Sequence, residues 1–312
     1  MSGLSARDIG HRVVVRHRLP GDQLTDVLGV LQAYDEDSLV VRHIDSTLHQ
    51  VRLEAVAAAK RIPPMPLRPV DVEQLLLTTA LGRPAVETAY LGQWLLRASG
   101  GWTGRANSLL PVGDPEMPIA DALKQAEAFY LERGLPPLAL VLPDSPLAEE
   151  FRRLGWRDAR PEQADPLVLH TTLDLVNAEP AYEVLVTEKP DAEWYEAAFE
   201  GAVPAEAPAV MEGAPKAAFA SVQLDGQVVA VGRGAMTGHW LGVDAVRVLP
   251  SHRRRRLATA VLQGLARWAG PQGARRSYLE VVEDNLPALT TYTNLGYALA
   301  YRYRYLTNQP AR

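Results

Sequence analysis

The sequence predicts an α/β (α+β) protein that begins with a small all-β barrel. Two observations predict this class. In roughly the first sixty residues, β-branched runs alternate with turn clusters, and beyond them strand and helix patterns follow one another to the C-terminus. The length of 312 residues is about twice that of an average domain. We therefore expect three modules, at residues 1–65, 66–178 and 179–312.

Composition excludes several classes of function. Hydrophobic residues make up 47% of the chain and charged residues 22%, as in globular rather than disordered proteins. The chain has no cysteine, which excludes disulfides, thiolate-bound metals and a cysteine nucleophile. No spacing of His, Asp and Glu is typical of a metal site, so we expect no metal. The net charge of −5 argues against nucleic acid as a partner.

Neither a membrane-spanning apolar run nor the apolar core of a signal peptide is present in the sequence. By default we expect a cytoplasmic protein without a membrane partner. The oligomeric state stays open at this stage.

Short β-branched runs predict the strands of the N-terminal barrel. They lie at residues 13–15, 27–31, 39–41 and 48–53. A unit of this kind would be a strongly bent barrel, similar in pattern to the Src-homology-3 or Tudor type. Prolines crowd segment 62–69, where each fixes its own φ angle. We expect a stiff linker and the first domain boundary in that segment.

The remainder of the chain alternates between helix and strand patterns. Apolar spacing predicts helices between residues 71 and 92 and a strand at 94–98. The order then becomes helix 119–133, strand 138–142, helix 146–154 and strand 168–175. After Pro190 we predict, in order, a helix at 192–199, strands at 217–224, 227–236 and 240–248, a helix at 257–269, a strand at 277–282, a helix at 286–295 and a strand at 298–306.

Two stretches of the sequence share one plan, which predicts an internal duplication. Residues 134–156 and 273–297 both place Gly before a buried strand, Pro at the start of a helix, and Leu-Gly-aromatic at its end. In both, the glycine supplies the backbone freedom that ends a helix. The first copy has no basic turn, so we expect a degenerate half that serves architecture or substrate shape.

The segment most informative about chemistry runs from Trp240 to Ala269. A strand ends at Pro250, a basic turn follows, and a helix with an apolar face begins at Leu257. Such a helix start holds anions, because its first amides lack partners within the helix and carry the positive end of the dipole. From Arg247 to Arg276 there are eight arginines and no acidic residue. The pattern favours a ligand with several phosphate charges.

This segment resembles the GNAT superfamily of acyl-CoA-dependent N-acyltransferases. The family turn reads R/Q-x-x-G-x-G/A after a strand that ends in V-x-P, and here Arg253–Ala258 follows Val248-Leu249-Pro250. Arg256 stands where the family has Gly. A second match is Asn285 to Tyr297, similar to N-x-x-A-x-x-x-Y-x-x-x-G-F/Y.

The resemblance implies a GNAT fold, tandem with a degenerate first half, and acetyl-CoA as cosubstrate. By position, it implies that the following residues bind the cofactor: Val246, Arg247, Val248, Arg253, Arg254, Arg255, Arg256, Leu257, Ala258, Asn285 and Ala288. Asn285 can also cap the helix that follows it.

The resemblance also implies three catalytic residues. Tyr292 would protonate the departing thiolate of CoA, since a phenol is protonated at neutral pH. For the general base we favour Glu280 over Asp244, because alternation along its strand places Glu280 opposite Leu279 and Val281. Either carboxylate could instead pair with nearby arginines.

The whole chain, with its barrel, the segment Trp102 to Ser108 and the C-terminal half, is similar to an actinobacterial family described as histone-acetyltransferase-like. Arg105, Asn107 and Ser108 either line an acceptor pocket or form a turn that hydrogen-bonds its own backbone. The resemblance implies direct acetyl transfer to a primary amine of a protein or a small molecule. The alternative is a non-catalytic CoA-binding or scaffold protein that uses the barrel as an interaction module.

Overall fold

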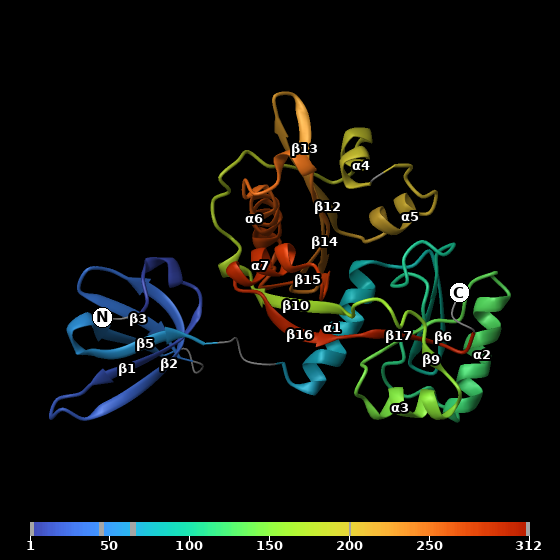
Figure 1. Ribbon diagram of the computed structural model, residues 1–312, viewed down its shortest axis with the longest axis horizontal. Helices are drawn as coiled ribbons and strands as arrows, with labels where there is room; N and C mark the ends of the chain where they lie inside the picture. The colour runs from blue at the N-terminus through green and yellow to red at the C-terminus, as the bar shows by residue number, and fades with distance from the viewer. Residues whose placement is uncertain (1–2, 44–46, 63–66, 200, 310–312) are drawn as a thin grey trace. The chain divides into compact units, whose positions relative to one another are not determined.

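A computed structural model of the protein describes residues 3–43, 47–62, 67–199 and 201–309 (Figure 1). The chain separates into two compact units, Met1–Pro66 and Leu67–Arg312. Most of the predicted linker, residues 63–66, lies outside the described residues. The two boundaries of the predicted three-domain division stay a prediction.

The N-terminal unit is an open five-stranded antiparallel sheet rather than the closed barrel that the sequence predicts. Its strand order is β4 (Leu48–Arg52), β3 (Ser38–Arg42), β2 (Leu24–Tyr34), β1 (Arg12–Arg18) and β5 (Val56–Arg61). A short 3-10 helix separates β4 from β5, and the two strands remain the edges of the sheet within the described residues. Val13, Val15, Leu31 and Val41 form the centre of its core.

The larger unit contains a seven-stranded sheet. Its strand order is β11 (Leu185–Thr187), β12 (Ala217–Leu224), β13 (Gln227–Thr237), β14 (Trp240–Val248), β15 (Arg276–Val282), β10 (Pro166–Thr172) and β16 (Ala298–Arg302). Neighbouring strands are antiparallel except β14 and β15, which are parallel. A parallel pair needs a crossover, and helix α6 (Leu257–Ala269) supplies it.

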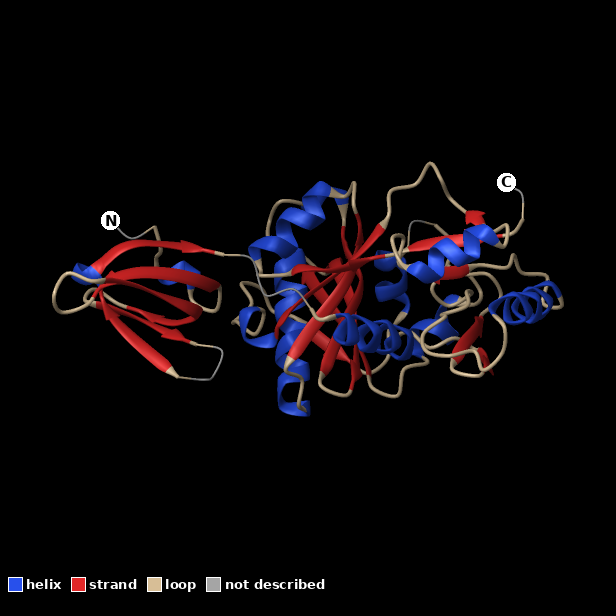
Figure 2. Cartoon of the chain, turned by 90° about the horizontal axis from the view of Figure 1, so that it is seen from below, coloured by secondary structure: helices blue, strands red, loops and turns tan. Residues whose placement is uncertain are grey.

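Helices cover both faces of this sheet (Figure 2). On one face α6 and α7 (Leu286–Asn294) contribute Val261, Leu265 and Tyr292 to the same core as the sheet residues Leu241 and Leu279. On the other face α1 (Pro69–Gly82) packs through Leu75, Leu76 and Ala80. Two short helices, α4 (Ala192–Ala198) and α5 (Ala207–Glu212), lie between β11 and β12 in the chain.

A second group of strands belongs to the first predicted half. Strands β6 (Glu87–Leu91) and β7 (Trp94–Ala98) form a hairpin, and single bridges join Leu95 to Leu110 and Leu109 to Ala139. The order continues through β8 (Ala139–Val141), β17 (Arg304–Thr307) and β9 (Arg157–Asp158). Helix α2 (Ile119–Leu131) precedes β8, and α3 (Pro146–Arg153) follows it.

The two halves therefore exchange their last strands. β10, from the first half, lies between β15 and β16, whereas β17, from the end of the chain, lies between β8 and β9. The colours of Figure 1 show this exchange, because the red β17 runs alongside the green β9. Neither half completes its sheet without a strand from the other.

Apart from the exchange, the two halves have the same connections. In each, an antiparallel pair leads into a strand, a helix crosses over to a parallel neighbour, a second helix follows, and the inserted strand is antiparallel to both of its neighbours. Thus α2 corresponds to α6, and α3 corresponds to α7. This correspondence supports the duplication predicted from residues 134–156 and 273–297.

Two predicted elements were wrong. The region from 71 to 92 is one helix and then strand β6, because Glu87–Leu91 alternates between exposed and half-buried positions in a hairpin with β7. The strand predicted at 298–306 is two strands in different sheets, with Tyr303 between them. Among the described residues, every helix is too short or too polar to span a lipid bilayer.

Candidate active site

Strands β14 and β15 part in the middle of the large sheet. Their parallel pairing runs from Trp240 and Arg276 to Val243 and Leu279, and no pairing continues beyond it in these two strands. The residues of β14 past this point change from buried to half-buried. One edge of β14 thus opens into a gap whose inner end is marked by Asp244 and Glu280.

A β-bulge lies at the start of this open edge. Ala245 and Val246 both stand opposite Gly232 of β13, since the pairs on either side are Arg233 with Asp244 and Val231 with Arg247. Ala245 has a φ of 52°, a left-handed conformation that is uncommon for a residue with a side chain. Bulges interrupt the ladder and redirect main-chain groups beside the inserted residue.

The basic turn after β14 leads into α6. The side chains of Arg253, Arg254, Arg255 and Arg256 are all exposed. Arg256 has φ 61° and ψ 19°, the left-handed conformation that glycine adopts most easily, and no side chain caps the helix at this position. The backbone therefore keeps the conformation suited to the family's glycine, while the guanidinium group points outward.

The other predicted cofactor residues surround this turn and the start of α7. The side chain of Leu257 is buried in the core, so only its amide faces the turn, and Ala258 is half-buried. Asn285 caps α7 as predicted, accepting a hydrogen bond at Oδ1 from the amide of Ala288 at 3.3 Å. Val248 is half-buried on the open edge of β14.

Tyr292 lies in the core beneath these elements, with 8% of its surface exposed. Its ring is 6.0 Å from that of Tyr297, centre to centre. Burial raises the pKa of the Tyr292 phenol to about 12. The group is therefore fully protonated at neutral pH, as a proton donor must be.

Asp244 is held between two buried arginines. Its Oδ1 lies 2.8 Å from Nη2 of Arg83, and its Oδ2 lies 2.7 Å from Nη1 of Arg233. Burial by itself would raise the pKa of Asp244, but the charges of Arg83 and Arg233 outweigh it, so the pKa is lowered. Both oxygens are engaged, and a carboxylate of this kind is a poor base.

Glu280 is paired in a different way. Nη1 of Arg105 and the hydroxyl of Tyr303 each donate to its Oε2 at 2.7 Å. Oε1 has no partner among the described residues, so one oxygen is left to accept a proton. As predicted, Glu280 lies on the face of β15 opposite Leu279 and Val281.

The segment from Trp102 to Ser108 forms a turn that hydrogen-bonds its own backbone, and its lining of an acceptor pocket stays a prediction. Asn107 stabilises the turn: its Oδ1 accepts from the amides of Ser99 and Gly101, and its Nδ2 donates to two carbonyls of the segment. The same turn places Arg105 so that its guanidinium group forms an ion pair with Glu280 of the other half.

Sequence reasoning missed several residues of this centre. They are Arg83, Arg97, Arg233 and Tyr303. A usable signal was present, because Arg97 and Arg233 each interrupt an otherwise apolar strand, and arginine is almost never buried without a partner.

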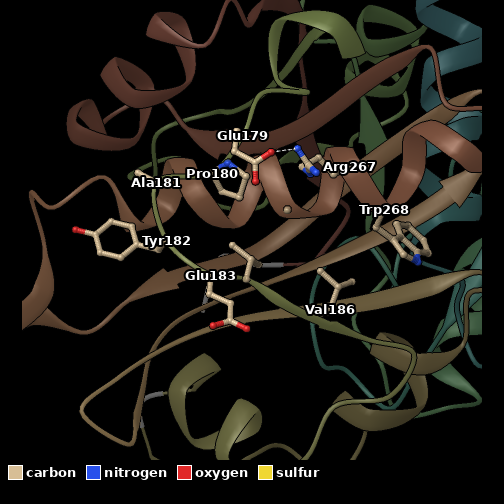
Figure 3. Close-up of a pocket in the computed structure, with 10 residues that line it drawn as sticks. Glu179, Pro180, Ala181, Tyr182, Glu183, Val186, Arg267 and Trp268 are labelled. Atoms are coloured by element: carbon tan, nitrogen blue, oxygen red, sulfur yellow. Dashed lines mark hydrogen bonds and ion pairs between the residues drawn. The ribbon is translucent and has the colours of Figure 1, made fainter.

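A cavity in the described part of the larger unit lies elsewhere. It measures about 640 Å³ and lies between residues 179–186 and α6, where Glu179 faces Arg267 (Figure 3). The segment approaches α6 closely because position 264 is glycine, and a Cβ there would meet Val184 at 2.5 Å. No predicted cofactor or catalytic residue lines this cavity.

Each of the two units matches a known family model. Residues 70–306 match the family model described as "Probable histone acetyltransferase Rv0428c C-terminal", and residues 7–60 match "Rv0428c N-terminal Sm-like domain". The N-terminal sheet thus matches an Sm-like domain.

Curated relatives and solved structures agree with this result. The chain is 28% identical to the probable histone acetyltransferase Rv0428c of Mycobacterium tuberculosis, covering 96% of each chain. It is 27% identical to the uncharacterized N-acetyltransferase YobR of Bacillus subtilis, over 75% of this chain and 98% of that protein.

Among solved structures, the fold is similar to a GCN5-related N-acetyltransferase from Kribbella flavida. The TM-score is 0.59 at 15% identity, covering 80% of this chain and 98% of the other. It is also similar to a tandem GNAT protein from the clavulanic acid pathway, with a TM-score of 0.50 at 14% identity over 80% and 91% of the two chains.

Proposed function

The chain belongs to the GNAT N-acetyltransferase family typified by the probable histone acetyltransferase Rv0428c, and from this premise we propose that it transfers an acetyl group from acetyl-CoA directly to a primary amine. The amine belongs to a protein lysine, a protein N-terminus or a small molecule, and the two substrates meet in a ternary complex. The observation that carries the proposal is the basic turn into α6, placed beside the open edge of β14.

The basic turn would hold the phosphates of CoA. The first amides of α6 lack partners within the helix, and the left-handed Arg256 leaves the turn backbone accessible. Arg253, Arg254 and Arg255 add charge around them, and guanidinium groups match phosphate oxygens in geometry. At the neighbouring helix, Asn285 and Ala288 would border the same ligand from the start of α7.

The open edge of β14 would hold the pantetheine arm and the acetyl group. An extended chain with amides can add to an unpaired strand edge through main-chain hydrogen bonds. Val246, Arg247 and Val248 offer that edge, and the bulge at Ala245 would turn an amide toward the gap. An amide fixed beside the acetyl carbonyl would stabilise the negative charge that develops there during attack.

Tyr292 and Glu280 would then handle the two proton transfers. Tyr292, with its raised pKa, protonates the departing thiolate of CoA. Glu280 takes the amine proton through a water molecule at its unpaired Oε1. We retain Glu280 rather than Asp244, because both oxygens of Asp244 are engaged by arginines.

Two measurements test the function. Acetyl-CoA at about a hundredfold its Kd should raise the free energy of unfolding by about 2.7 kcal/mol, seen as a shift in thermal unfolding. Addition of amines should then release free CoA, followed with a thiol reagent. The panel includes a lysine-rich peptide, a peptide with a free N-terminus, a polyamine and small amino acids.

The same measurements separate the enzyme from its rival. Binding of acetyl-CoA without release of CoA across all amines would contradict acetyl transfer and favour a CoA-binding scaffold. In that case the N-terminal Sm-like unit would be the module that recruits a partner. Absence of any thermal shift would contradict both.

A further inference from the structure

A group of six charged side chains lies at the inner end of the gap between β14 and β15. This group, which we call the arginine cluster, comprises Arg83, Arg97, Arg105, Arg233, Asp244 and Glu280. Its members come from both halves of the larger unit. Four guanidinium groups face two carboxylates, so two positive charges are in excess.

Arg233 and Asp244 are already paired within the cluster, and Glu280 is paired at one of its two oxygens. Arg233, with none of its surface exposed, donates to Asp244 and to the carbonyls of Met211 and Gly82. Asp244 contacts Arg233 and Arg83, and Glu280 contacts Arg105. Arg233 and Asp244 hold the architecture and have little capacity left for a ligand, whereas Glu280 keeps Oε1 for the proposed proton transfer.

Three arginines keep unused donors. Arg97 is 3% exposed and donates from Nε and Nη2 to Ser108, and its Nη1 has no partner among the described residues. The guanidinium groups of Arg83 and Arg105 each contact one carboxylate oxygen and have further N–H groups without partners in the described part of the chain. None of these nitrogens is sealed off from solvent.

A buried excess of positive charge is costly unless an anion compensates it. Arg97 contacts no carboxylate in the described residues, although Glu280 lies within range of its charge. Unpaired guanidinium donors in such a place are suited to carboxylate or phosphate oxygens. The same charge repels polyamines, although the net charge of the whole chain is −5.

We propose that the acceptor amine carries an oxyanion, a carboxylate or a phosphate, which binds to Arg83, Arg97 and Arg105. This inference rests on the proposed acetyl transfer. The oxyanion would anchor the acceptor at the cluster, while its amine reaches the open edge of β14. The arginine cluster thus selects the substrate, and the basic turn into α6 binds the cosubstrate.

The test compares amines that differ in one charged group. Glycine, β-alanine, γ-aminobutyrate and O-phosphoethanolamine carry an oxyanion, n-butylamine carries no charged group besides its amine, and putrescine carries a second ammonium group. We expect kcat/KM, measured by CoA release, to be at least about tenfold higher for the best oxyanion acceptor than for n-butylamine. The carboxylate and phosphate acceptors distinguish the two kinds of oxyanion. Equal or better use of n-butylamine, putrescine or a lysine-rich peptide would overturn the proposal.

Variants of the cluster arginines provide a second test of the proposal. Arg105→Gln should lower kcat/KM for n-butylamine as well, because Arg105 contacts Glu280, but the fall for the oxyanion acceptor should be about 10- to 100-fold larger. This ratio separates recognition from general loss of folding, which would lower both values together. Arg97→Gln should act in the same direction. Arg157→Gln, on an exposed arginine of β9 without an ion pair among the described residues, is the matched control.

Binding distinguishes the failure of this inference from that of the proposed function. If no amine is acetylated, titration calorimetry with the oxyanion acceptors, with and without acetyl-CoA, decides the matter. Heat of binding that Arg105→Gln abolishes supports the oxyanion site even without transfer. An absence of binding to the protein in both conditions overturns the site, whatever acetyl-CoA does.

Discussion

The turns that lead into α6 and α2 occupy the same position in two halves of equal topology, but they carry opposite charges. Residues 251–256 hold four exposed arginines and no acidic residue. The turn at residues 111–118 holds no arginine, contains Asp114 and Glu116, and uses the amide of Glu116 for a hydrogen bond to Asp114 Oδ1 at 2.7 Å. The two halves therefore share a fold without sharing a predicted anion site, because that site depends on the residues of the turn.

The helices that follow the parallel strand differ in a similar way. Counting back from the glycine that ends each helix, Phe151 of α3 corresponds to Tyr292 of α7. Both rings pack against the next aromatic residue, Trp156 or Tyr297, at 5.8 and 6.0 Å. The first half thus keeps the packing of the ring and lacks the hydroxyl that could donate a proton.

Removing the positive charge of the basic turn into α6 should have the largest effect. We expect the triple substitution Arg253→Gln, Arg254→Gln and Arg255→Gln to weaken acetyl-CoA binding about 100- to 1000-fold, because charged hydrogen bonds to phosphate are lost. Titration calorimetry at several salt concentrations measures it. Asp114→Asn with Glu116→Gln in the first turn is the matched control and should leave the affinity unchanged. Equal effects of the two sets would contradict the difference between the halves.

Making α7 resemble α3 comes next. Tyr292→Phe removes only the hydroxyl, so the ring packing should persist and kcat should fall about 100-fold through loss of the general acid. The dissociation constant of acetyl-CoA should stay within about twofold. Steady-state kinetics and thermal unfolding together measure both, and an unchanged kcat would show that the hydroxyl has no role.

Lowering the pH should reduce the stability of the protein through β10, one of the two exchanged strands, and not through β17. His170 of β10 is buried, and this burial, with the charge of Arg276, lowers its pKa to about 4. The unfolded chain binds a proton near pH 6.5, so the stability from neutral His170 is complete above that pH and falls as the pH drops toward 4. Between pH 7 and 4.5 the loss should be about 2 kcal/mol.

Urea unfolding of the protein and of His170→Gln at both pH values measures this loss by difference, since the other titrating groups are common to the two proteins. β17, Arg304–Thr307, contains no histidine, so it contributes no loss of stability of this kind. A loss that is the same in the variant would assign the acid sensitivity elsewhere.

The smallest expected effect is on stability, and it concerns the backbone of the basic turn into α6. Arg256→Gly should stabilise the protein by up to about 1 kcal/mol, because glycine adopts the left-handed conformation without steric cost. Arg255→Gly, at a neighbouring position without a positive φ, should destabilise it slightly through the entropy of the unfolded chain. Denaturant unfolding of both variants tests the opposite signs.

Local signals predicted the parts of the site that depend on neighbouring residues. The strand before Pro250, the helix from Leu257, the cap at Asn285 and the faces of β15 follow from short-range patterns, and the structure has all four. These features are decided within a few residues, where periodicity and capping chemistry act.

Long-range pairing could not be predicted in this way. Residues 298–306 look like one strand, yet β16 and β17 join different sheets. The ion pairs of Asp244 and Glu280 likewise depend on Arg83 and Arg105, which are more than a hundred residues away in the chain. Nothing in a single strand indicates which distant edge or charge it will meet.

The position of β17 also bears on how the protein is made. Ribosomes release a chain from its N-terminus, and domains generally fold as they emerge. Here the sheet around β8 and β9 waits for Arg304–Thr307, which are synthesised well after both of these strands. Until β17 has been synthesised, two strand edges of the earlier half are without their neighbour, which makes this half a natural client for chaperones during that interval.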